Sequence, residues 1–190
     1  MSNDLIILDG NSLTIEELTS IKQIDTKVEL SVASVKAINQ SGKLVEEIVS
    51  SGDIVYGINT GFGALSNVTV AKEQLEQLQT NLIRSHACGV GENMDPDSVL
   101  MMMVVRVNSL AKGNSGARLE LIQLLIDMIN SRIAPIVPRI GSLGASGDLA
   151  PLSHMTLAMM GESHSQIQAN DGTWTTDYSL NILENNGLKP

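Results

Sequence analysis

Residues 141–154 read Gly-Ser-Leu-Gly-Ala-Ser-Gly-Asp-Leu-Ala-Pro-Leu-Ser-His, and the tripeptide Ala145-Ser146-Gly147 inside this stretch can form an electrophile from backbone alone. Attack of the Gly147 amide nitrogen on the Ala145 carbonyl, with loss of water, would close a five-membered ring. Loss of the Ser146 hydroxyl would then leave an exocyclic methylidene, so that the product is a methylidene-imidazolone. Gly147 suits this step because it has no Cβ to block the attack. The same tripeptide also fits a glycine-rich turn in which Ser146 or Asp148 caps the helix that follows.

Two further segments, in the same order along the chain, carry side chains suited to work on a substrate. Residues 56–63 read Tyr-Gly-Ile-Asn-Thr-Gly-Phe-Gly, and residues 81–91 read Asn-Leu-Ile-Arg-Ser-His-Ala-Cys-Gly-Val-Gly. Together with residues 141–154, these segments resemble the signatures of the aromatic amino acid ammonia-lyases, and the resemblance extends over essentially all 190 residues. It implies a mainly α fold with the helical core of the ammonia-lyase type.

The resemblance also implies a reaction, the non-oxidative elimination of ammonia from an amino acid. In this family the methylidene-imidazolone, here from Ala145, Ser146 and Gly147, makes the amino group a better leaving group, and a tyrosine removes the β-proton. Tyr56 matches that tyrosine. Because a phenol is a poor base at neutral pH, the role requires a pocket that stabilises the phenolate. From the residues alone, Tyr56 also fits a tyrosine at a strand end with a buried ring.

His86 is the candidate substrate-binding residue. A lone histidine near a helix end is usually structural, and His154 and His164 do not share metal-ligand spacing with it, so that no metal site is expected. The resemblance implies that His86 faces the substrate side chain. The pair Ser85-His86 resembles family members that use histidine more than those that use phenylalanine, which implies elimination of ammonia from L-histidine to give urocanate.

Several alternatives remain open. Within the same chemistry, the chain could belong to a tyrosine or phenylalanine ammonia-lyase or aminomutase. In a different class, it could be a truncated, non-catalytic subunit or assembly module that keeps the fold without closing the ring. Asp148 could polarise the ring-closing amides or cap a helix. His154 could either pack in the interior or hold residues of the site in position.

Composition and the resemblance together define the expected partners. With 12 basic and 21 acidic residues and a net charge of −9, the chain repels nucleic acid and anionic membranes. Cys88 is the only cysteine, and no signal-peptide pattern or bilayer-spanning apolar run occurs, so we expect a cytoplasmic protein. The resemblance implies an amino acid substrate, no external cofactor and a homotetramer. Since family members are much longer, residues 1–190 are expected to form the N-terminal portion of a longer chain, with no internal boundary and incomplete catalysis on their own.

Periodicity and turn residues predict a few short strands near the N-terminus, one small hairpin, and otherwise helices. Thr14 and Ser31 are expected to cap the first two helices, and the Asp95-Pro96 pair a later one. The expected helices are a short one after residue 14 and longer ones at 31–52, 70–88, 95–110, 117–133 and about 149–160. The expected strands are at 5–8 and 53–58, with a hairpin at 166–176. Loops are expected at 59–63 and 141–147, and extended chain at 135–138.

Overall fold

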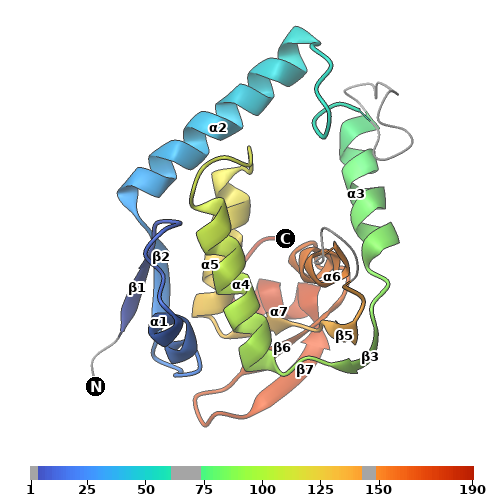
Figure 1. Ribbon diagram of the computed structural model, residues 1–190. Coiled ribbons are helices and arrows are strands. Elements are labelled where there is room, and N and C mark those ends of the chain that lie inside the picture. Colours follow the sequence, from blue (N-terminus) through green and yellow to red (C-terminus); the bar gives the residue numbers. More distant parts are fainter. Residues whose placement is uncertain (1–3, 61–73, 143–148) are drawn as a thin grey trace.

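The computed structural model describes residues 4–60, 74–142 and 149–190, and helices dominate these parts of the chain (Figure 1). The mainly α fold predicted from the sequence is therefore confirmed. The helices are α1 (Ile15–Ser20), α2 (Val32–Ser51), α3 (Leu75–His86), α4 (Pro96–Leu110), α5 (Leu119–Asn130), α6 (Leu149–Met159) and α7 (Ser179–Asn185). The strands are β1 (Leu5–Leu8), β2 (Lys27–Leu30), β3 (Val90–Asn93), β4 (Ile133–Pro135), β5 (Pro138–Ile140), β6 (His164–Gln168) and β7 (Trp174–Tyr178).

The helix boundaries read from capping residues are confirmed. The Thr14 side chain accepts the Glu17 backbone N–H while the Glu17 carboxylate accepts that of Thr14, which completes a capping box. Ser31 caps α2, and α2 ends at Gly52, whose φ of 80° is the left-handed conformation that favours glycine. Asp95 caps α4, which begins with a proline.

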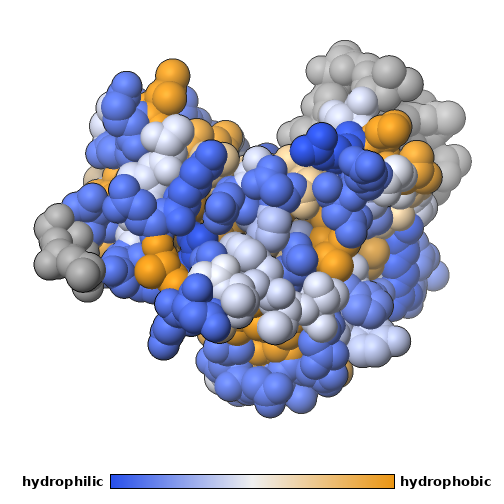
Figure 2. Space-filling view, turned by 90° about the horizontal axis from the view of Figure 1, so that it is seen from below, coloured by the Kyte–Doolittle hydropathy of each residue, from blue (hydrophilic) through white to orange (hydrophobic). Residues whose placement is uncertain are grey.

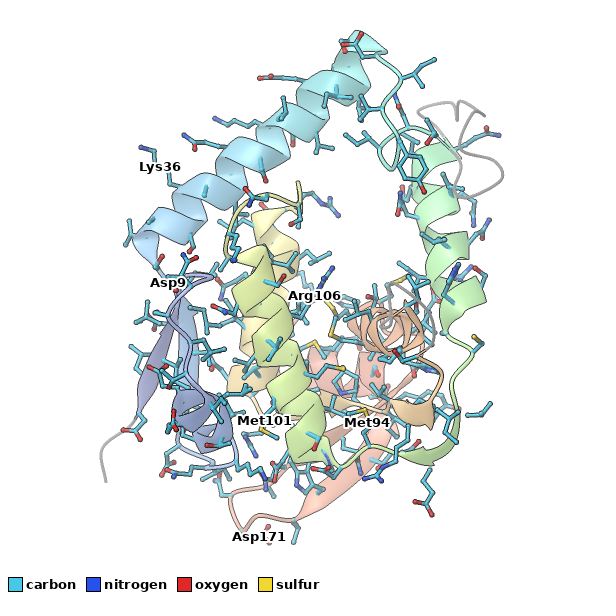
Figure 3. All side chains as sticks on the ribbon, in the orientation of Figure 1. Asp9, Lys36, Met94, Met101, Arg106 and Asp171 are labelled. Atoms are coloured by element: carbon cyan, nitrogen blue, oxygen red, sulfur yellow. The ribbon has the colours of Figure 1, made fainter. Side chains whose placement is uncertain are left out.

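Other expectations needed correction. Residues 53–58, expected as a strand fragment, form an irregular turn instead. The helix expected over 117–133 ends at Asn130, and the first residues of the helix expected from residue 70 lie outside the described part of the chain. Strands β2 and β3 were not predicted. The expected hairpin is confirmed as β6 and β7, with Asp171 at its tip (Figure 3), and β4 pairs antiparallel with β6 to make three strands.

The core is centred on α4 and α5, which lie between the β1–β2 pair on one side and the β4–β6–β7 sheet with α6 and α7 on the other (Figure 1). Asn130 at the end of α5 joins one side to this centre, because its side chain accepts the Val28 N–H at 2.9 Å and donates to the Val28 carbonyl at 3.0 Å. The fully buried side chains include Leu8, Ile21, Val28, Ile38, Leu100, Met103, Ile122, Leu125, Met128, Ile129, Ile133 and Leu183.

Arg132 is a buried cation at the base of this core. Its guanidinium donates to Asp97 Oδ1 at 2.9 Å, to Gln168 Oε1 at 2.8 Å and to the Ile21 carbonyl at 2.5 Å, and it lies 5.5 Å from the ring centre of Trp174. Burial lowers the pKa of Arg132, while the Asp97 carboxylate acts in the opposite direction. Arginine stays charged even when its pKa is lowered. The cost of burying that charge is therefore offset by the hydrogen bonds and the ion pair with these partners.

Helices α2 and α3 extend away from this core (Figure 1). α2 buries only Ser34 and Ile38, and α3 buries no residue. The face in Figure 2 is mostly hydrophilic, with hydrophobic residues in separate small groups. Of the helices in the described ranges, none has both the length and the apolar character needed to cross a membrane.

Candidate functional site

The turn at residues 53–60 presents Tyr56 to solvent. The Asn59 side chain braces this turn, because its Oδ1 accepts the Val55 N–H at 2.9 Å and its Nδ2 donates to the Asp53 carbonyl at 2.8 Å. Asn59 and Thr60 are buried, whereas Tyr56 is 65% exposed. Residues 53–58 form a turn in which the Asn59 side chain and the Val55 carbonyl, which accepts the Ile58 and Asn59 N–H groups, satisfy backbone polar groups locally.

His86 lies in the last turn of α3, and its ring is held by the backbone one turn earlier. Nδ1 lies 2.8 Å from the Leu82 carbonyl oxygen and 3.0 Å from Ser85 Oγ, which itself donates to the same carbonyl. A carbonyl oxygen can only accept, so Nδ1 carries a proton. In the neutral ring, Nε2 is then left with a lone pair and can accept a hydrogen bond.

His154 lies in α6 and contacts the loop that follows α3. Its Nε2 accepts the Gly89 N–H at 3.0 Å. Burial lowers the pKa of His154, which favours the neutral ring that this contact requires. The alternatives for His154 were interior packing and support of the site. The structure shows a specific contact with the segment just beyond His86.

Close packing of two glycines brings three chain segments together. A Cβ on Gly141 would lie 3.0 Å from Gly89 Cα and 3.0 Å from Ala150 Cβ. Val90 of β3 also pairs with Ile140 of β5. The end of α3, the end of β5 and the first turn of α6 therefore meet at one place, which is where the two flanks of residues 143–148 lie.

Ala145, Ser146, Gly147 and Asp148 lie outside the described residues, so their expected roles stay predictions. What the structure brings together is His154, the loop that begins directly after His86, and the segments on either side of that tripeptide. It does not bring Tyr56 to them. The 53–60 turn lies level with the first turn of α3 in Figure 1, whereas His86 is at the other end of this helix, about 18 Å along it.

A salt bridge adds a second link between α3 and the end of α6. Arg84 donates to both carboxylate oxygens of Glu162, at 2.8 and 2.6 Å. This pair raises the pKa of Arg84 and lowers that of Glu162, mainly through the hydrogen bonds between the two side chains. Because both side chains are substantially exposed, solvent weakens the attraction.

Sequence reasoning missed the part played by Gly89, which it interpreted only as a helix stop. The sequence did contain a signal for close packing here. Gly89 and Gly91 follow the expected helix, and a second glycine-rich stretch begins at Gly141. Within 4–60, 74–142 and 149–190, no three His, Cys, Asp or Glu side chains are grouped so as to hold a metal ion.

Comparison with known proteins now identifies the family. The model of the aromatic amino acid lyase family matches residues 13–190. The chain belongs to this family. A histidine ammonia-lyase of Staphylococcus aureus is 51% identical over 157 residues, which are 83% of this chain and 31% of that protein. The chain thus spans about a third of the length of the aromatic lyase relatives it matches.

Solved structures of the aromatic lyase family have the same fold. A histidine ammonia-lyase from Trypanosoma cruzi superposes with a TM-score of 0.86 at 37% identity, over 98% of this chain and 35% of that one. A tyrosine aminomutase from Streptomyces globisporus superposes with a TM-score of 0.84 at 31% identity, over 97% of this chain and 34% of that one. The family implied by the three motifs is therefore confirmed.

Proposed function

We propose that this chain is part of a histidine ammonia-lyase, which eliminates ammonia from L-histidine to give urocanate. The observation that carries the proposal is the 2.8 Å contact of His86 Nδ1 with the Leu82 carbonyl oxygen: because a carbonyl needs a donor, Nε2 is left to accept the N–H of a substrate imidazole. The contact of Gly89, three residues after His86, with Gly141 on the flank of residues 143–148 supports the proposal, as do the histidine ammonia-lyases from Staphylococcus aureus and Trypanosoma cruzi.

Residue types support a self-made electrophile at Ala145-Ser146-Gly147. A small residue, a residue with a hydroxyl on Cβ and a glycine stand in the order that ring closure requires. A methylidene-imidazolone formed from them would supply the electrophile that makes the substrate amino group a better leaving group. The proposed reaction needs no external cofactor or metal, because this electrophile comes from the chain itself.

Tyr56 is the proposed base. Its phenolate oxygen would take the β-proton, and the electron pair of that C–H bond would form the double bond as the amino group leaves. The braced 53–60 turn and the exposure of its phenol support this role, since the side chain is accessible to a substrate. The role also requires that the complete assembly bring Tyr56 to the segments around His86 and enclose its exposed phenol in the pocket that a phenolate needs.

The proposal extends to the rest of the protein. Residues 1–190 would be the N-terminal portion of a longer cytoplasmic chain, without an internal domain boundary, and the active enzyme would be a homotetramer. The 31% coverage of the Staphylococcus aureus relative supports a longer chain. Because an incomplete chain would lack part of the site, activity is expected of the full-length protein.

A second candidate substrate is an aromatic amino acid with a phenol. His86 Nε2 can accept a phenolic O–H as well as an imidazole N–H, and the tyrosine aminomutase from Streptomyces globisporus shares this fold. A tyrosine or phenylalanine lyase or aminomutase would use the same electrophile. The non-catalytic alternative, an assembly module, differs from all of these because its tripeptide stays linear.

Two measurements on the full-length protein test the proposal. Intact mass should be lower than the translated mass by two water molecules, and Ser146→Ala should prevent loss of the second. Turnover of L-histidine should exceed that of tyrosine and phenylalanine, and His86→Leu should reduce kcat/KM for histidine by about 10- to 100-fold, the worth of a lost hydrogen bond at a buried polar group. The full translated mass in an assembled protein would contradict the electrophile, and preferred turnover of tyrosine would support the second candidate.

A further inference from the structure

We propose that His154 is a positioning residue that fixes the end of α3, and with it His86, against α6. The inference rests on the proposed function, because His86 matters here as the group that holds the substrate side chain. It goes further by assigning a role to a histidine that the proposed reaction does not itself use.

The backbone after α3 shows why an outside acceptor is needed. The Ala87 N–H donates to the Ile83 carbonyl, and the Cys88 N–H donates to the His86 carbonyl. The next amide, that of Gly89, instead donates to His154 Nε2 at 3.0 Å, across 65 positions of sequence. The backbone N–H groups up to Cys88 therefore have local acceptors, and His154 is the acceptor for the next one, that of Gly89, three residues beyond His86.

The contact is closely packed. A Cβ on Gly89 would lie 3.0 Å from His154 Nε2 and 3.2 Å from Pro138 Cβ, so that the backbone lies directly against the imidazole ring and β5. Gly89 has little room to move toward another acceptor. Without the imidazole, the partly buried Gly89 N–H would lose its acceptor. An unsatisfied buried donor costs its full desolvation free energy.

The Arg84–Glu162 pair cannot replace this contact. That salt bridge is formed by exposed side chains, Arg84 lies two residues before the end of α3, and the pair makes no hydrogen bond to the loop at 87–89. His154 acts on the backbone of the loop itself. The two links together fix the last turn of α3 and the loop that follows it, and the His154 contact lies nearer the flanks of residues 143–148.

Acid should release the contact. Protonated His154 carries a hydrogen on Nε2 and cannot accept the Gly89 N–H. Burial is the cause that lowers the pKa of His154, so the contact persists at neutral pH and weakens in acid. The ionisable side chains on the neighbouring described segments are Glu76, Arg84 and His86 on α3, Cys88 in the loop, Glu92 on β3, Arg139 on β5, Glu162 after α6 and Glu184 on α7.

Two substitutions in the full-length protein separate positioning from simple packing. In His154→Gln, Oε1 can reach the place of Nε2 and accept the Gly89 N–H at any pH, whereas His154→Leu offers no acceptor. His164→Gln is the matched control, because His164 stacks on Tyr178 in β7 and takes no part in this contact. The measurements are KM and kcat for L-histidine between about pH 5.5 and 8, and hydrogen exchange of the Gly89 amide.

We expect His154→Leu to raise KM by about tenfold, as the loss of one hydrogen bond would, and to lower kcat less. Gly89 exchange should become faster in the same variant. His154→Gln should keep the wild-type KM and slow exchange at neutral pH, and its KM should not rise in acid as the wild-type KM does. The control should match wild type throughout.

The proposal is overturned if His154→Leu leaves KM and Gly89 exchange unchanged, or if His154→Gln raises KM as much as His154→Leu. The two proposals can fail separately. A wild-type protein that turns over no amino acid ends the proposed function, while Gly89 exchange in the variants still decides whether His154 holds the end of α3.

Discussion

Helices α5 and α3 have the same length, 12 residues, but opposite environments. α5 buries Ile122, Leu125, Ile126, Met128 and Ile129, and packs on α4, α2 and two strands. α3 buries no residue, packs mainly on α6 among the described elements, and is linked to it by side chains at its C-terminal end. The candidate substrate-binding residue, His86, therefore lies on α3, which contributes no buried residue, whereas α5 supplies a large part of the core.

This difference teaches that stability and the candidate site depend on different interactions. The core around α5 rests on burial of apolar area, which is large and insensitive to pH or salt. The end of α3 rests on a few polar contacts, which are weaker and respond to both. Substitutions on the two helices should therefore differ in size and in the conditions that change them.

The largest effect is expected where a buried charge follows α5. Arg132→Met removes a guanidinium with three hydrogen-bond partners and leaves the Asp97 carboxylate without its ion pair. We expect a loss of about 4 kcal/mol in the free energy of unfolding, because the Ile21 carbonyl, the Gln168 amide oxygen and the partly exposed Asp97 carboxylate all lose a charged donor. Urea unfolding followed by circular dichroism at fixed protein concentration measures it. A loss no greater than that of an exposed arginine would contradict the role given to this residue.

Matched truncations compare the two helices directly. Leu125→Ala in α5 should cost about 3 kcal/mol, because Leu125 is only 1% exposed and its loss leaves a cavity. Leu78→Ala in α3 should cost less than half as much, since Leu78 is only partly buried. The same urea titration measures both, and equal losses would remove the distinction between the helices.

A smaller effect, with a pH dependence, is expected at the start of α4, which packs on α5. Hydrogen bonds from Ser98 lower the pKa of Asp95, so its stabilising contribution is present above the ordinary value of 3.8 and is lost as the pH falls through the lowered value. Asp95→Ala should cost about 1 kcal/mol at pH 7, the worth of an N-cap. The difference from wild type should shrink in strong acid, while Asp95→Asn, which keeps an acceptor, should lose little at pH 7.

The smallest effect is expected on α3. Arg84→Gln removes the exposed pair with Glu162, and we expect no measurable change in the urea midpoint at high salt. At low salt a small decrease should appear. A large decrease that persists at high salt would show that α3 contributes to the core in a way the described contacts do not explain.

Sequence patterns predicted those parts of the fold that local chemistry decides. Thr14, Ser31 and Asp95 mark helix starts because a side-chain oxygen satisfies a backbone N–H within three residues, which a sequence shows directly. The hairpin around Asp171 is local for the same reason, since its side chain accepts the Thr173 N–H.

Distant partners decide the parts that sequence reasoning missed. β2 pairs parallel with β1 and is tied to Asn130 about 100 residues later, and no local pattern reveals that partner. In the candidate site, His86 was predicted from its motif, and its role in binding substrate stays a proposal. The contact of His154 with Gly89 joins two motifs that were considered separately, so only a three-dimensional arrangement could reveal it.

The contacts of Arg132 also constrain the order of events on the ribosome. Its guanidinium joins residues 21, 97 and 168, so the last of its acceptors is synthesised long after the first. A nascent chain that has emerged only as far as α5 holds neither this arginine nor the glutamine that completes its shell. We therefore expect protease resistance of stalled nascent chains to appear only after the β6–β7 hairpin has left the exit tunnel.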